Sequence, residues 1–150
     1  MKPKDEVMFD ITAFGGTPVF ITAIILLFFS GKVMHSLQFL IGYIACFVIT
    51  IPIRLVYFRQ RPDKSKVTGW FTRIFQSSFP SLHSLRVTTL ALLTAFFFNT
   101  LALYIILPIV AILVMITRVG LKRHFISDVI AGAIFGILIS GVLVYFSIPI

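Results

Sequence analysis

The sequence predicts an all-α polytopic membrane protein, a helical bundle with about five transmembrane helices. Hydrophobic residues make up 59% of the 150 residues and charged residues only 12%, and the mean hydropathy is +1.06. Soluble domains are far more polar. The apolar residues also form long runs of the length that crosses a bilayer. With no internal repeat and no polar domain, residues 1–150 are expected to form one integral-membrane domain.

The charge balance indicates which partners to expect. The net charge of +8 arises from 13 Lys and Arg against 5 Asp and Glu. These charges cluster in short loops beside apolar runs, which is typical of membrane topology and an anionic substrate rather than of a nucleic-acid surface. Cys46 is the single cysteine and lies within an apolar run, so no disulfide framework is expected. The expected partners are the lipid bilayer and an anionic substrate.

The first two spans follow a charged start. Met1–Asp10 is expected to be an interfacial or loose head. The stretch Gly15-Gly16-Thr17-Pro18 indicates a break, then an N-cap and a proline at the first helical position. The first span is expected from about Pro18 to the Gly31 region. The second is expected from Leu37 to Phe58, with a kink at Pro52.

The segment Arg59–Phe79 is the longest polar stretch. Its charged residues are Arg59, Arg61, Asp63, Lys64, Lys66 and Arg73. Within it, four large apolar residues recur at roughly helical spacing, namely Trp70, Phe71, Ile74 and Phe75. This pattern predicts a short amphipathic helix at the level of the lipid headgroups. An ordinary aromatic anchor is the alternative interpretation.

Three further spans complete the bundle. They are expected at Pro80–Phe98, at Leu101 to about Thr117, and at Phe125 to near Phe146. In the last of them, small residues fall four apart, at Gly132, Gly136 and Ser140. Such a stripe allows a neighbouring helix to approach closely, so it predicts tight packing rather than chemistry.

Five spans place the polar segments at one end of the bundle. This polar end carries the charged head, the Arg59–Phe79 segment and the Val119–His124 loop. Twelve of the 13 Lys and Arg lie at or near it, and only Lys32 lies at the other end. Lys and Arg in short loops favour the cytoplasmic side, so the sequence predicts a cell-membrane protein whose polar end faces the cytoplasm.

Three clusters of polar residues meet at the polar end. They read Arg54-x6-Arg61-Pro62, Pro80-Ser81-Leu82-His83 and Arg118-x5-His124-x3-Asp128. Ionisable residues near a bilayer are costly and usually functional. Arginine offers a planar fork suited to phosphate. The clusters therefore indicate an anion site with acid–base groups beside it.

Local spacing suggests how parts of this site work. If a helix begins near Phe125, His124 and Asp128 lie one turn apart, where a carboxylate can fix the imidazole tautomer and stabilise its charged form. Pro80 at a first helical turn would leave the amides of Ser81, Leu82 and His83 free to bind phosphate oxygens.

Two other interpretations of these residues remain open. The Thr117–Asp128 stretch alone is also typical of a polar turn at a membrane surface. His83, His124 and Asp128 are residue types that bind metals, but three nearby arginines would repel a divalent cation, so neither a metal nor a cofactor is expected.

Together, the three clusters resemble the signature of the type 2 phosphatidic acid phosphatase superfamily. That signature reads Lys-x6-Arg-Pro, Pro-Ser-Gly-His and Ser-Arg-x5-His-x3-Asp, and the order and internal spacings match from Arg54 to Asp128. Arg54 replaces the family Lys, Thr117 replaces Ser, and Leu82 replaces Gly. Leucine cannot take a positive φ cheaply and adds bulk, so Leu82 is the departure that bears on activity. The family core often has six spans, so this chain resembles a trimmed form.

The resemblance implies a membrane phosphatase that uses no metal. His124 would be the nucleophile that forms a phosphohistidine, Asp128 would orient it, and His83 would be the general acid and then the base. The phosphoryl group would be bound by Arg54, Arg61, Arg118, Ser81 and Leu82. A polyprenyl diphosphate is the favoured substrate, and phosphatidate or phosphatidylglycerophosphate is the alternative. An alternative of another class is a catalytically weak protein that binds or transports anionic lipids.

Arg86 lies one helical turn after His83 and is not part of the signature. A charge at that depth is costly unless it snorkels, pairs or meets an anion. It is therefore a candidate ligand for the second phosphate of a diphosphate, which its fork could grip. A pair with Asp128, or a snorkelling side chain, is the alternative.

Overall fold

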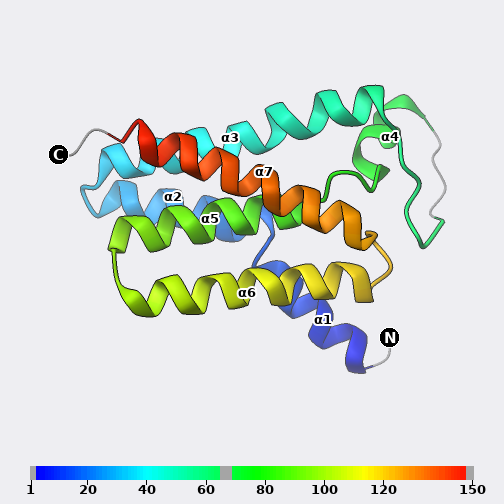
Figure 1. Ribbon diagram of the computed structural model, residues 1–150, viewed down its shortest axis with the longest axis horizontal. Helices are drawn as coiled ribbons and strands as arrows, with labels where there is room; N and C mark the ends of the chain where they lie inside the picture. Colours follow the sequence, from blue (N-terminus) through cyan, green and yellow to red (C-terminus); the bar gives the residue numbers. More distant parts are fainter. Residues whose placement is uncertain (1–2, 65–68, 148–150) are drawn as a thin grey trace.

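The computed structural model describes residues 3–64 and 69–147 (Figure 1). These residues form helices and connecting loops, without a strand. The helices are α1 Pro3–Ala13, α2 Thr17–Phe29, α3 Val33–Val56, α4 Trp70–Gln76, α5 Leu82–Phe98, α6 Leu101–Gly120 and α7 Ile126–Tyr145. The predicted all-α fold is confirmed.

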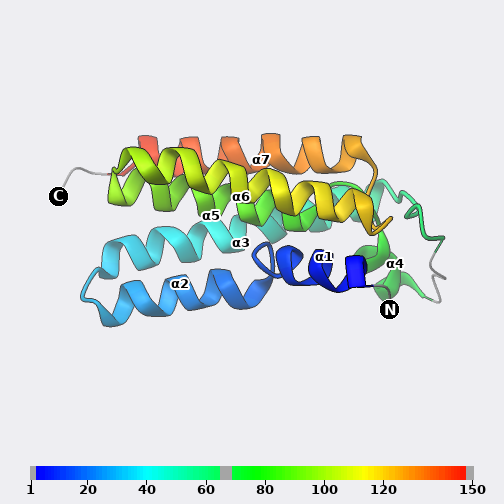
Figure 2. The same ribbon diagram turned by 90° about the horizontal axis from the view of Figure 1, so that it is seen from below.

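Four helical segments are long and apolar enough to cross a membrane: Asp5–Phe29, which joins α1 and α2, and the helices α3, α6 and α7. The shorter apolar helix α5 lies among them and packs against α7, α6 and α3 (Figures 1 and 2). Large apolar side chains on the outer faces are exposed, as at Ile105, Ile109, Ile112 and Ile116 of α6. Such a surface suits lipid, so the expected multi-pass bundle of about five spans is confirmed.

The two ends of the bundle differ as the sequence predicts. Figure 1 shows the beginning of α1, α4 and the α6–α7 loop at one end. The α2–α3 turn, the α5–α6 turn and the end of α7 lie at the other end. The predicted short helix at the polar end is α4. Its Ile74 is buried and its Phe75 is half exposed. Lys66 and the side chains of Trp70 and Phe71 lie outside the described part of the chain.

The N-terminal segment is more ordered than expected. The predicted loose head forms helix α1, which packs against α6 (Figure 2). The predicted break is present between α1 and α2, but the N-cap is Gly16 rather than Thr17. The hydroxyl of Thr17 instead takes part in side-chain hydrogen bonds with Tyr43 and Arg86. The break brings Gly15 against α5, where an added Cβ would lie 3.1 Å from the His83 carbonyl oxygen.

Other helix boundaries shift by a few residues. Helix α3 continues through Pro52 and ends at Val56, before the predicted Phe58. Helix α6 runs to Gly120, one turn beyond the predicted end, and so includes Arg118. Helix α5 begins at Leu82, not at Pro80, because the Ser81 side chain caps it by accepting from the Ser84 amide.

The predicted small-residue stripe packs α7 against α5. A Cβ added at Gly132 would lie 2.5 Å from the Ser81 carbonyl oxygen, and one at Gly136 would lie 2.8 Å from that of Leu85. Ser140 is buried in the same contact and donates to the Gly136 carbonyl. Backbones approach this closely only at small residues, so the packing prediction is confirmed.

Candidate active site

The structure brings the three polar clusters together at the polar end of the bundle. Arg54 lies in the last turn of α3, and Arg61 follows in the next loop. Ser81, Leu82 and His83 form the start of α5. Arg118 lies in the last turn of α6, and His124 and Asp128 flank the start of α7. The ionisable groups close to His83 include Arg118, Arg86, His124 and Arg61, so residues distant in sequence share one site.

Arg54 and Arg61 hold the segment that leads into α5. Arg54 is 4% exposed and donates to the carbonyls of Ile74 at 3.0 Å and Pro80 at 2.8 Å. Arg61 donates to the Phe75 carbonyl at 2.7 Å. Both arginines therefore fix α4 and the approach to the α5 N-terminus while their charge stays at the site.

A hydroxyl of the N-terminal helix α1 orients the side chain of Arg118. It is 7% exposed, and its Nη1 donates to the Thr12 hydroxyl of α1 at 3.4 Å. The hydroxyls of Thr117 and Thr12 also bond, at 3.2 Å. Thr12 was not expected from the sequence, because it lies 106 residues before Arg118 and carries no motif.

The site arginines make no direct ion pair with a carboxylate in the described part of the chain. Within the described residues, none of Arg54, Arg61, Arg86 and Arg118 forms an ion pair, and the Nε of each is buried without a hydrogen-bond partner. Burial and the neighbouring Arg123 lower the pKa of Arg61. Buried charges of one sign require a counter-charge, so this end of the bundle is suited to an anion.

His124 is held by a backbone carbonyl. Its ring is 2% exposed, and Nδ1 lies 2.7 Å from the Ser78 carbonyl oxygen. The predicted one-turn spacing to Asp128 is present, but Oδ2 of Asp128 lies 3.9 Å from Nδ1. Burial, followed by the charge of Arg118, lowers the pKa of His124 to about 3. The ring is therefore neutral near pH 7, with Nδ1 donating to Ser78.

Asp128 makes its hydrogen bonds to other groups. It is fully buried, and Oδ2 accepts from the Phe125 amide at 2.8 Å, which caps α7. Oδ1 accepts from Arg59 Nη1 at 2.7 Å. Arg59 was not among the candidates from sequence, although it stands two residues before Arg61 in the same polar segment.

The start of α5 differs from the prediction in one respect. The Ser81 amide is not free for a phosphate, because it donates to the Asp128 carbonyl at 3.0 Å and links α5 to α7. The amides of Leu82 and His83 are the first two of the helix. Neither donates a hydrogen bond to another described residue. These two amides are the ones that could bind an oxyanion.

Leu82 fits its place without strain. It stands at the first position of α5 and is not among the residues with positive φ. Its side chain packs beside Cys46, Leu85 and Ile139. The bulk that replaces the family glycine therefore points into the bundle core.

Arg86 lies on the α2 and α3 side of α5. Its Nη1 donates to the Thr17 hydroxyl, and its guanidinium lies 5.9 Å from the centre of the Phe47 ring. The expected alternative of a pair with Asp128 is wrong, because that carboxylate pairs with Arg59.

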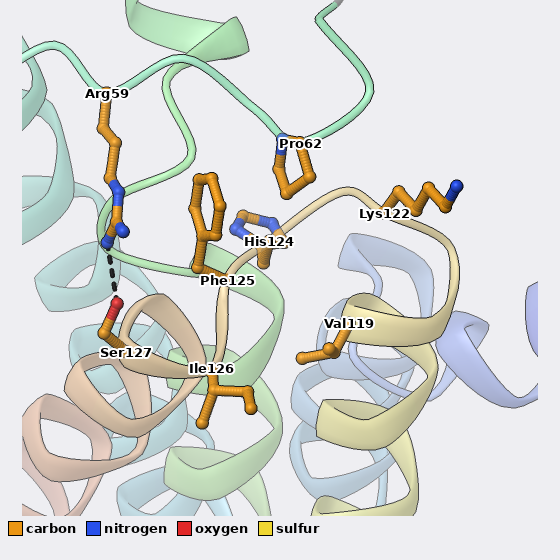
Figure 3. A pocket seen from close by; sticks show the side chains of 8 residues that line it. All are labelled: Arg59, Pro62, Val119, Lys122, His124, Phe125, Ile126 and Ser127. Atoms are coloured by element: carbon orange, nitrogen blue, oxygen red, sulfur yellow. Dashed lines mark hydrogen bonds between the residues drawn. The ribbon is translucent and has the colours of Figure 1, made fainter.

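A pocket of about 490 Å³ opens beside His124 (Figure 3). Positively charged and apolar side chains share its wall, which is formed by Arg59, Pro62, Val119, Lys122, His124, Phe125, Ile126 and Ser127. It joins the buried histidine to the exterior.

Comparisons with known proteins identify a family and a similar fold. The profile of the PAP2 superfamily matches residues 35–148. The structure is similar to the crystal structure of the first transmembrane PAP2 type phosphatidylglycerolphosphate phosphatase from Bacillus subtilis, with a TM-score of 0.80 and 27% sequence identity. The alignment covers 97% of this chain and 78% of that chain. No curated protein matches at a significant level. The chain belongs to the PAP2 superfamily.

Proposed function

We propose that this chain is a membrane lipid phosphatase that removes a terminal phosphoryl group through a phosphohistidine at His124. The observation that carries the proposal is a set of buried and half-buried arginines that, among the described residues, form no ion pair with a carboxylate and lie beside two histidines. Phosphoryl transfer requires mainly positioning and charge stabilisation, which Arg54, Arg61 and Arg118 can supply together.

His124 is suited to be the nucleophile. Because Nδ1 faces the Ser78 carbonyl at 2.7 Å, the proton resides on Nδ1 and the lone pair on Nε2. The lowered pKa keeps the ring neutral before attack. In the first step, Nε2 forms a bond to phosphorus while the bond from phosphorus to the lipid oxygen breaks.

His83 is proposed as the acid–base partner. When the negative charge of a bound phosphoryl group lies beside it, the His83 ring holds a proton and gives it to the departing lipid oxygen in the first step. In the second step it accepts a proton from water, whose oxygen attacks phosphorus and breaks the bond to Nε2 of His124. The products are the dephosphorylated lipid and inorganic phosphate. Asp128, at 3.9 Å from Nδ1, stabilises the imidazolium that exists between the two steps.

The substrate is proposed to be a lipid with one terminal phosphate, with phosphatidylglycerophosphate as the first candidate. The Bacillus subtilis protein of similar structure is a phosphatidylglycerolphosphate phosphatase. Arg86, the residue that motivated a diphosphate preference, already donates to the Thr17 hydroxyl of α2 through Nη1, so this nitrogen is not free for a second phosphate. Polyprenyl diphosphate is the second candidate, because Arg59 and Lys122 place additional positive charge on the pocket wall.

Phosphate release by the purified protein in detergent with EDTA tests the proposal. The panel contains phosphatidylglycerophosphate, phosphatidate and a polyprenyl diphosphate of matched solubility. We expect metal-independent release, lost in His124→Ala. Acid-labile phosphate should be trapped on the wild type and not on the variant. Near-normal release by His124→Ala would exclude the phosphohistidine, and no release from any lipid would leave the anionic-lipid binder as the function.

A further inference from the structure

Arg59, which lies between Arg54 and Arg61 in the sequence, has its side chain fixed by residues at the start of α7. Its Nη1 donates to the Ser127 hydroxyl and to Asp128 Oδ1, both at 2.7 Å. The guanidinium lies 4.1 Å from the centre of the Phe125 ring. Its backbone carbonyl accepts from the Ser78 amide at 2.8 Å, in the segment that holds His124. Arg59 is therefore held by the start of α7 and by the segment that precedes α5.

One edge of this guanidinium is unoccupied. Nη1 makes both side-chain hydrogen bonds, and Nε and Nη2 have no hydrogen-bond partner within the described residues. The side chain is 31% exposed, whereas Asp128 beneath it is fully buried. Arg59 and His124 line the same pocket (Figure 3). An anion that reaches His124 through this pocket also meets the free edge of Arg59.

Building on the function proposed above, we infer that Arg59 is a further phosphate-binding residue. Its Nη1 holds Asp128 while Nε and Nη2 donate to a phosphoryl oxygen of the substrate. The guanidinium fork can make both sets of contacts at once, which a lysine ammonium cannot do with the same geometry. This placement also offsets the repulsion between the Asp128 carboxylate and the incoming phosphate.

Inorganic phosphate binding to the purified protein in detergent tests the inference. The variants are Arg59→Gln, Arg59→Lys, Asp128→Asn and the double variant Arg59→Gln/Asp128→Asn. Arg123→Gln is the matched control, because Arg123 is similarly exposed, lies in the α6–α7 loop and pairs with Asp63. Thermal unfolding checks that each variant is folded. Lipid phosphate hydrolysis by the wild type is measured in the same preparation, so failure of the proposed function is detected separately.

We expect Arg59→Gln to raise the Kd for phosphate by about 10- to 100-fold, the loss typical of a hydrogen bond to a charged group. Arg59→Lys should be intermediate, and Arg123→Gln should change the Kd by less than about threefold. The loss should persist when Asp128→Asn is the background. The inference is overturned if Arg59→Gln behaves like Arg123→Gln. It is also overturned if the loss vanishes in the Asp128→Asn background, because Arg59 would then act only on Asp128.

Discussion

The substitution Gly132→Ala probes the contact on which the two halves of the site depend. The added Cβ would lie 2.5 Å from the Ser81 carbonyl oxygen and 3.0 Å from Ser84 Cβ. Ordinary contacts begin at 3.4 Å, so the start of α5 and the start of α7 must separate by about 0.9 Å. Neither neighbouring atom lies at the flexible end of a side chain, so the helices themselves must move.

That separation acts directly on the catalytic groups. The hydrogen bond from the Ser81 amide to the Asp128 carbonyl crosses the same contact. It holds His83, on α5, at a fixed distance from His124, beside α7. A displacement of about 1 Å in a catalytic geometry can reduce the rate by about 100-fold. We expect Gly132→Ala to lower kcat/KM by about 10- to 100-fold.

Stability should change less than activity. Overpacking a helix contact costs about 1–3 kcal/mol, whereas alanine is favoured over glycine inside a helix by about 1 kcal/mol. The two effects oppose each other in Gly132→Ala. Activity therefore reports the displacement more sensitively than thermal unfolding does.

Two other glycines of α7 provide matched controls. A Cβ at Gly141 meets nothing within 4 Å, so Gly141→Ala isolates helix propensity and should leave kcat/KM unchanged. Gly136→Ala has a similar clash one turn deeper, at 2.8 Å from the Leu85 carbonyl oxygen, and should affect stability more than activity. The assay is kcat/KM on a short-chain lipid phosphate, with thermal unfolding in the same detergent. A kcat/KM for Gly132→Ala within about twofold of that for Gly141→Ala would refute the reasoning.

Three further predictions follow from single contacts. Thr12→Val removes the hydroxyl that accepts a hydrogen bond from Arg118, so we expect kcat/KM to fall by about 3- to 10-fold. Thr12→Ser keeps the hydroxyl and should retain activity. Equal losses in the two variants would exclude a role for the hydroxyl. The pKa of His124 is about 3 in the fold, against 6.5 for an ordinary histidine in the unfolded chain, so the unfolded chain binds more protons between these two pH values. Its stabilising effect is therefore complete above about pH 6.5 and is lost as the pH falls toward 3, so between pH 7 and 4.5 the Tm of the wild type should fall more than that of His124→Gln; equal falls would contradict this. Impermeant thiol labelling in intact cells should modify Lys32→Cys and not Lys64→Cys if the polar end is cytoplasmic, and the opposite pattern would reverse the orientation.

The sequence predicts the parts of this structure that depend on local pattern. Helix spans follow from apolar runs, and the close contact at Gly132 follows from small residues four apart. The groups that complete the site have no such pattern. Thr12 reaches Arg118 only because α1 packs on α6, and the Ser78 carbonyl that holds His124 is a backbone group present at every residue. Sequence spacing places Asp128 one turn from His124, but it cannot show that Arg59 donates a hydrogen bond to Oδ1 of Asp128.

The buried arginines explain why the polar end is built as it is. Folding transfers the charge of each arginine out of water and leaves its Nε without a hydrogen-bond partner. Both effects lower the free energy of unfolding. Their other nitrogens bond to backbone carbonyls and hydroxyls, such as those of Pro80 and Thr12, rather than to carboxylates. A carboxylate partner would stabilise the empty fold but would compete with phosphate for the same fork. Asp128, the one acid that is buried among the described residues, pairs with Arg59 instead. The site therefore keeps its positive charge available, and a bound phosphate supplies the counter-charge that the fold itself omits.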